Sequence, residues 1–166
     1  MTIPLARWLV VVAMAASLAG CAGGPVRSAS PAPASVATVS SLPPGFPLGA
    51  WVVTITEQDL LAGGLPNEPG LLGENSGKFT KTYAPDGTWT VVQEAAVPLR
   101  APVFRGTFRA SGPNEIEETT TFPPDYAGDV VRYTWAREGS GVRFRVVNPP
   151  DPLLPVLTET HPWQPA

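Results

Sequence analysis

Prolines and glycines interrupt this chain of 166 residues so often that long helices have no room in most of it. The sequence holds 21 prolines and 16 glycines. Proline removes a backbone hydrogen bond from a helix interior or a central strand, and glycine favours turns. Hydrophobic residues still make up 43% of the chain, which is enough for a core. The sequence therefore predicts short elements joined by turns, and places the remaining prolines in a linker.

Residues 49–166 carry a strand pattern. Residues 49–56 alternate between apolar and polar, and a short helix is expected to start at Thr56 and to end at the glycines that follow Ala62. Residues 65–76 are expected to be loop, and a last strand is expected at 156–160. Three further pairs of alternating segments flank turn sequences, at 78–83 and 88–94, 103–110 and 115–122, and 130–138 and 142–147. About eight short antiparallel strands predict an all-β barrel or sandwich.

Turn chemistry predicts the strand registers. A Pro-Asp-Gly loop at residues 85–87 places Tyr83 opposite Trp89, and a two-residue Gly-Ser turn places Trp135 opposite Phe144. The resulting inner face is rich in aromatic side chains, namely Trp51, Tyr83, Trp89, Phe104, Phe108, Phe122, Tyr133, Trp135 and Phe144. On the opposite face, Arg105 and Arg109 are expected to form solvated pairs with Glu115 and Glu117.

One acidic residue, Glu118, alternates onto the aromatic face. An isolated buried charge is very costly, so this carboxyl group must be paired, protonated or close to an open end of the fold. It could orient a polar group of a ligand. The sequence favours a rim position in contact with water.

The first twenty residues have the pattern of an export signal. Arg7 precedes an apolar run at residues 8–18, which is shorter than the roughly 20 residues that cross a membrane. The run ends in Leu-Ala-Gly-Cys21, which resembles the lipobox of bacterial lipoproteins. The resemblance implies that residues 1–20 are removed and that the thiol of Cys21, the only cysteine, takes a diacylglyceryl group. The alternative is a secreted protein with an ordinary small-residue cleavage site.

Residues 21–48 are predicted to tether this anchor to the folded domain. After the cysteine they are rich in proline, alanine and serine, with Arg27 as the single charge and no regular period. A first strand hidden in residues 35–42 is the alternative. Together these segments predict a protein anchored by lipid on the extracytoplasmic face of the cell membrane.

A family resemblance starts at Gly49-Ala50-Trp51, which is similar to the G-x-W signature of lipocalin-like (calycin) barrels. Residues 83–89 resemble the aromatic-flanked Asp-Gly turn of small bacterial lipocalin-like lipoproteins, and the Ala-, Pro- and Arg-rich composition is similar to that of actinobacteria. The resemblance implies an antiparallel up-and-down barrel of about eight strands with one short helix after the first. It also implies that Trp51 closes one end and packs against an arginine, for which Arg143 and Arg145 are the candidates. No T-D-Y segment of the true lipocalins is present.

Composition argues against several functions. A net charge of −3 gives no reason to bind nucleic acid, and a single histidine and a single cysteine leave little for a metal site or cofactor. No nucleophile motif accompanies His161, which is expected to pack beside Trp163 near the end of the chain rather than to act as a base. The acids of the loop at residues 123–129 lack calcium-loop spacing. We therefore expect a protein that is not an enzyme.

The aromatic inner face suggests a barrel that binds a small apolar or lipidic ligand. The residues expected to line that site are Trp51, Tyr83, Trp89, Phe104, Phe108, Glu118, Tyr133, Trp135 and Phe144. The same side chains would equally form the core of a filled barrel, which would serve as a protein-interaction or structural module of the cell envelope. A connected apolar cavity of a few hundred Å³ would favour the ligand, and a filled interior would favour the module.

Overall fold

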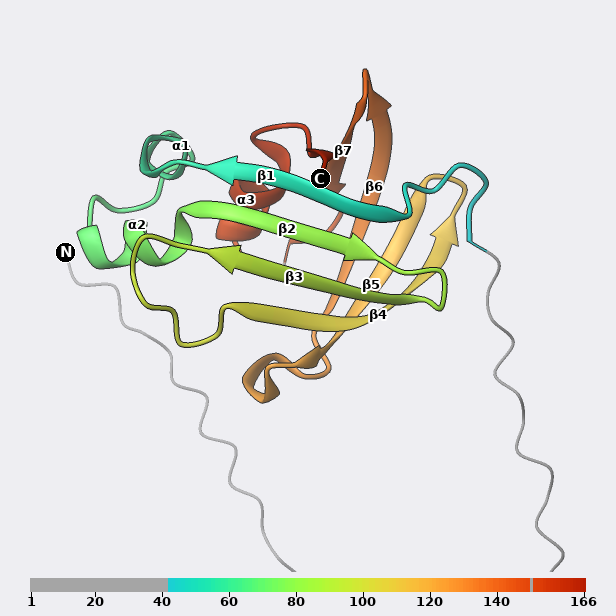
Figure 1. Cartoon of the computed structure of the whole chain (residues 1–166), viewed down its shortest axis with the longest axis horizontal. Helices are drawn as coiled ribbons and strands as arrows, with labels where there is room; N and C mark the ends of the chain where they lie inside the picture. The colour runs from blue at the N-terminus through green and yellow to red at the C-terminus, as the bar shows by residue number, and fades with distance from the viewer. Residues whose placement is uncertain (1–41, 150) are drawn as a thin grey trace, which may run out of the picture. The chain divides into compact units, whose positions relative to one another are not determined.

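Seven strands follow one another around a single antiparallel sheet in chain order (Figure 1). They are β1 (Gly49–Ile55), β2 (Gly77–Tyr83), β3 (Thr88–Glu94), β4 (Val103–Gly112), β5 (Glu115–Phe122), β6 (Val130–Glu138) and β7 (Gly141–Val146). An eighth, β8 (Gln164–Pro165), pairs with β1. The computed structural model describes residues 42–149 and 151–166, so the export signal, Cys21 and most of the predicted tether lie outside the described residues. The predicted all-β up-and-down barrel is confirmed.

The hairpin registers follow from the turn residues. Tyr83 pairs with Trp89, and the Ala84 N–H donates to the Thr88 carbonyl at 2.9 Å across the Pro-Asp-Gly loop. Trp135 pairs with Phe144 across the Gly-Ser turn. Because side chains alternate across a strand, these registers place the predicted aromatic residues on the inside.

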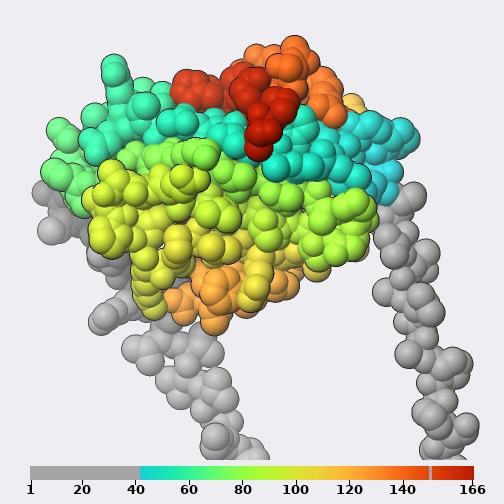
Figure 2. All heavy atoms as spheres, viewed as in Figure 1, coloured from blue at the N-terminus to red at the C-terminus, as the bar shows by residue number. Residues whose placement is uncertain are grey.

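The C-terminal residues close the barrel between β7 and β1. Trp163 and Val142 of β7 exchange two backbone hydrogen bonds of 2.8 and 2.9 Å, and the pairing of β8 with β1 continues the ladder. Gly141 is required here, since a Cβ atom at this position would lie 2.7 Å from the Trp163 carbonyl oxygen. Figure 2 shows the last residues lying over the outer surface of β1.

Three α-helices and one 3-10 turn connect the described strands. Helix α1 (Glu57–Ala62) begins at the predicted cap, where Thr56 and Asp59 form a reciprocal capping box. Helix α2 (Pro69–Asn75) lies in the segment expected to be a loop; its first residue is a proline, which fits the first helical position. A short 3-10 turn (Pro124–Tyr126) connects β5 to β6. None of the described helices is long and apolar enough to span a membrane.

The prediction of a strand at residues 156–160 is wrong, because helix α3 (Leu153–Glu159) occupies most of this segment. The Leu153 N–H donates to the Asp151 carboxylate at 2.6 Å, and Pro155 stands in the first turn, where proline is tolerated. Val156 is buried against Gly63 at the end of α1, where a Cβ atom would lie 2.5 Å from a Val156 methyl group. This packing between distant segments outweighs the local strand propensity.

The inward position expected for Phe122 is also wrong. The register of β4 with β5 shifts between Arg105 and Gly106, so that Arg105 pairs with Phe122 while Gly106 pairs with Thr120. The one-residue bulge turns Phe122 to the outer face, where the Arg105 guanidinium lies 4.8 Å from its ring centroid.

The last residues assigned to the tether belong to the core. Phe46 is 7% exposed and Pro47 is fully buried, and the Pro47 carbonyl accepts a 2.8 Å hydrogen bond from Trp51 Nε1. The tether assignment is therefore wrong for these residues. A Pro-Pro-Gly sequence that looks like a linker here forms a turn that carries Phe46 into the barrel.

We predict that Trp51→Ala destabilises the domain by about 3–5 kcal/mol, because Trp51 is 5% exposed and the truncation leaves a large cavity. Urea unfolding followed by circular dichroism measures the loss. Tyr126→Ala is the matched control, since its ring is 48% exposed and its removal should change the unfolding midpoint little. An unchanged midpoint for Trp51→Ala would contradict the barrel-closing role of this residue.

Candidate functional site

An ion pair occupies the interior of the barrel. Lys81 of β2 and Glu118 of β5 are each 3% exposed, and the Lys81 Nζ atom lies 2.7 Å from Glu118 Oε1 and 3.0 Å from Oε2. Of the options for Glu118, pairing is the one the structure supports, and the favoured rim position is wrong. Lys81 lies two residues before Tyr83 in the same strand, so strand alternation alone places it on the inner face.

Tyr83 completes the coordination of the carboxylate. Its hydroxyl donates a short hydrogen bond to Glu118 Oε1. Burial, followed by the nearby Glu118 charge, raises the pKa of Tyr83 well above its ordinary value, and the same two causes raise the pKa of Tyr133. Both phenols are therefore neutral at physiological pH, and Tyr83 meets the Glu118 carboxylate as a hydrogen-bond donor.

Aromatic rings surround the ammonium group. The Lys81 Nζ atom lies 4.5 Å from the ring centroid of Tyr133, 5.2 Å from that of Tyr83, 5.5 Å from that of Trp89 and 5.6 Å from that of Phe144. Each ring presents electron density to a cation at these distances. The predicted lining residues Tyr83, Trp89, Glu118, Tyr133 and Phe144 thus contact a side chain of the protein itself. We call Lys81 with these five residues the buried cluster.

Two other predicted lining residues pack around Phe46. Its ring centroid lies 5.2 Å from that of Phe108 and 5.7 Å from that of Trp135, and it also lies 4.9 Å from that of Tyr83. Phe104 is only half-buried and lies near the other end of the barrel, where its ring packs edge-on against Tyr126 at 5.4 Å. Apart from Trp51, the predicted set is therefore divided between two clusters and one contact at the rim.

Trp51 lies outside both clusters. The Arg137 guanidinium lies 5.1 Å from its ring centroid, so the arginine that packs on Trp51 is Arg137. The candidates Arg143 and Arg145 are wrong, because strand β7 alternates them to the outside while Val142 and Phe144 point inward. Arg143 instead pairs with Glu138 and donates to the Glu159 carbonyl at 2.7 Å.

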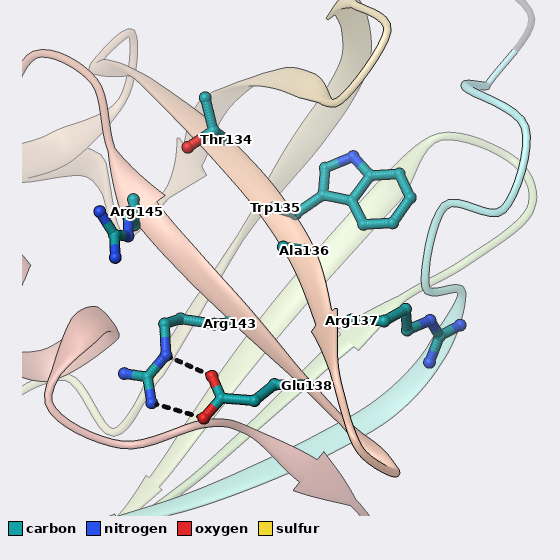
Figure 3. Close-up of a pocket in the computed structure, with 7 residues that line it drawn as sticks. All are labelled: Thr134, Trp135, Ala136, Arg137, Glu138, Arg143 and Arg145. Carbon is teal, nitrogen blue, oxygen red and sulfur yellow. Dashed lines mark hydrogen bonds and ion pairs between the residues drawn. The ribbon is translucent and has the colours of Figure 1, made fainter.

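Two hollows on the described part of the chain lie over the outer surface of the barrel. One, of about 340 Å³, lies over β6 and β7 and includes Thr134, Ala136, Glu138, Arg143 and Arg145 (Figure 3). Trp135 also borders it, but Figure 3 shows its ring on the other side of β6 from Arg143 and Arg145. The second, of about 310 Å³, is lined by Val130, Arg132, Val147 and Asn148. Neither is the apolar interior cavity expected for a small ligand.

Of the ion pairs expected on the outer face, only that of Arg109 with Glu117 forms among the described residues, and Glu117 is buried rather than solvated. Arg105 instead lies over the Phe122 ring, and Glu115 accepts from Ser111. Glu117 accepts from Arg109 at 2.5 Å, as expected from the register, and also from Arg132 of β6 at 3.0 Å. These hydrogen bonds lower the pKa of Glu117 below its ordinary value. These ion pairs therefore stabilise the pairing of β5 with β4 and with β6 at neutral pH.

His161 joins the C-terminal segment to α1. Its Nε2 atom lies 3.1 Å from an oxygen of Asp59, which forms the capping box of α1 with Thr56. Among the described residues, no group of three or more histidine, cysteine and acidic side chains is arranged to hold a metal ion. The histidine thus takes part in a contact between segments rather than in a pairing with a nucleophile.

Comparison of the chain with family models, with curated proteins and with solved structures finds no match in any of the three.

We predict that Lys81→Met and Glu118→Gln each destabilise the fold by about 3–5 kcal/mol, because each leaves an uncompensated charge in the core. The double variant should be more stable than the Lys81→Met single variant, since a neutral amide in place of the Glu118 carboxylate leaves no unpaired charge and still accepts from Tyr83. Urea unfolding of the four proteins measures the coupling energy. The exposed Lys78–Glu94 pair is the control, whose coupling should stay below about 1 kcal/mol. Additive losses for Lys81 and Glu118 would contradict the pairing.

Proposed function

We propose that this protein is an exported lipoprotein, anchored to the cell membrane through diacylated Cys21, whose filled lipocalin-like barrel acts as a structural or protein-interaction module of the cell envelope. The anchor rests on the export signal and the lipobox-like Leu-Ala-Gly-Cys21 sequence. The module rests on one observation, which is that the buried cluster occupies the interior where a ligand would lie.

The buried cluster argues against a resident apolar ligand. A molecule that took this position would have to separate Lys81 from Glu118, and two buried charges without partners cost several kcal/mol. The aromatic residues expected to bind the ligand already contact Lys81 or Phe46. These contacts favour the filled barrel over the small-molecule carrier.

The described outer surface has exposed apolar side chains that a partner protein could contact. Val130 and Val147 are each about half exposed and border the same hollow as Arg132. Exposed apolar side chains beside an arginine are compatible with a protein contact surface, where arginine is enriched. The one histidine faces Asp59 rather than a nucleophile, and a non-enzymatic role is part of the proposal.

Native mass spectrometry of the full-length protein, purified in detergent from membranes, tests both parts of this proposal. We expect the mass of the chain from Cys21 onward plus covalent acyl groups, with no further molecule bound in stoichiometric amount. Cys21→Ser should lose the acyl mass and the membrane location while retaining the fold. An apolar molecule bound one-to-one in the wild type would contradict the filled barrel, and acylation of Cys21→Ser would contradict the anchor.

A further inference from the structure

The two outer hollows follow one another along the hairpin of β6 and β7. One is lined by residues near the turn of the hairpin, and the other by residues near its open end. Thr134 pairs with Arg145 in one outward rung, and in the next the Val147 N–H donates to the Arg132 carbonyl at 2.9 Å. The hollows therefore adjoin. We call the residues that line them on this outer face the outer trough, namely Val130, Arg132, Thr134, Ala136, Glu138, Arg143, Arg145 and Val147.

The outer trough is positively charged, although the whole chain has a net charge of −3. It holds three arginines and one glutamate. Figure 3 shows Arg143 and Arg145 on one side of the hairpin and Arg137 on the other. Arg143 is already engaged, since its Nη2 atom donates to Glu138 at 3.0 Å and its Nη1 atom to the Glu159 carbonyl at 2.7 Å. These bonds fix one wall of the trough.

Arg145 has no carboxylate partner of its own. Its side chain is exposed, and no acidic side chain of the described residues forms an ion pair with it. Residues 1–41 contain neither aspartate nor glutamate, so that segment has no carboxylate side chain to offer. The guanidinium of arginine presents its donors in a planar fork that matches a carboxylate. Arg145 is therefore available to a carboxylate from another molecule.

An apolar pair lies one rung away from Arg145. Val130 and Val147 are 49% and 50% exposed, and both line the second hollow. Residues two apart on a strand project from the same face about 6.6 Å apart, and alternate side chains of any extended peptide have the same spacing. Arg145 and Val147 are two residues apart. The outer trough therefore matches an extended segment that carries a carboxylate and an aliphatic group two positions apart.

We propose that the outer trough binds an extended segment of a partner protein, in which an acidic residue faces Arg145 and an aliphatic residue two positions away contacts Val130 and Val147. This inference rests on the proposed protein-interaction module and names the chemistry of its partner. Arginine beside exposed apolar side chains suits such an interface, because it combines a charged fork with area that can be buried.

The acidic residues around the outer trough argue against a membrane surface as the occupant. Glu117 lies 3.0 Å from Arg132, and Glu138 pairs with Arg143. A surface that is uniformly anionic would meet both carboxylates, and like charges brought together weaken binding. A segment with one carboxylate placed at Arg145 avoids this repulsion.

A blocked peptide, acetyl-Thr-Glu-Thr-Val-Thr-amide, is the probe. Its two controls replace Glu by Gln or Val by Ser. Fluorescence anisotropy of labelled peptides with the full-length protein in detergent measures Kd, and NMR spectra locate the site. We expect saturable binding that weakens with salt, and shifts of the Arg145 Nε–H resonance and of the amides of Thr134 and Val147. Each control peptide should bind roughly threefold or more weakly.

Arg145→Gln separates a defined contact from general attraction. This variant should bind the Glu peptide roughly threefold more weakly and should lose the preference for Glu over Gln, because the two changes remove the same contact. Lys78→Gln is the matched control. It makes the same change of charge on β2, at a side chain that is 48% exposed, and should leave both affinities unchanged.

Equal binding of the Glu and Gln peptides by the wild type would overturn the proposal, as would equal losses for Arg145→Gln and Lys78→Gln. Tighter binding of a short polyphosphate, or of vesicles containing phosphatidylglycerol, at the same amides would also overturn it, since the occupant would then be a phosphate polymer or the membrane. The native mass of the protein reports the anchor and the barrel interior, so it tests the filled barrel separately from this outer surface.

Discussion

The ion pair between Lys81 and Glu118 sets what the interior of this barrel can contain. Two charges that are each 3% exposed require mutual contact and further polar or aromatic partners, because their desolvation costs several kcal/mol per ion. Tyr83 supplies the hydrogen bond and the surrounding rings supply the cation–π contacts. The position of β2 relative to β5 is thereby specified across the barrel, since any other arrangement leaves a buried charge unpaired.

Two segments outside strands β1 to β7 complete the core, one before β1 and one after α3. Phe46 enters from the residues before β1, and Trp163 enters from those after α3 and is 3% exposed. Trp163 also bridges β7 to the sheet edge, so barrel closure depends on the last residues of the chain. A domain of this size uses such segments to bury more apolar surface than its strands alone can cover.

Strand alternation and turn chemistry were sufficient to predict the sheet and the pairing of Tyr83 with Trp89. They also place Lys81 and Glu118 on the same inner face, but the contact between them joins residues 37 apart in the sequence and arises only when the sheet curves closed. The bulge that turns Phe122 outward has no turn signal, and the helix at Leu153–Glu159 is decided by packing of Val156 against Gly63. Tertiary packing therefore limited prediction of the candidate site more than that of the fold.

The ammonium group of Lys81 offers the most direct test of a filled interior. The chain has two lysines, and the second, Lys78, has a side chain that is 48% exposed. Proton–nitrogen NMR spectra at neutral pH should show one lysine NH₃⁺ resonance protected from water, shifted upfield by the rings, close to Tyr133 protons and absent from Lys81→Met. Two lysine signals with rapid exchange and ordinary shifts would contradict the account, because the centre of the barrel would then be open to water.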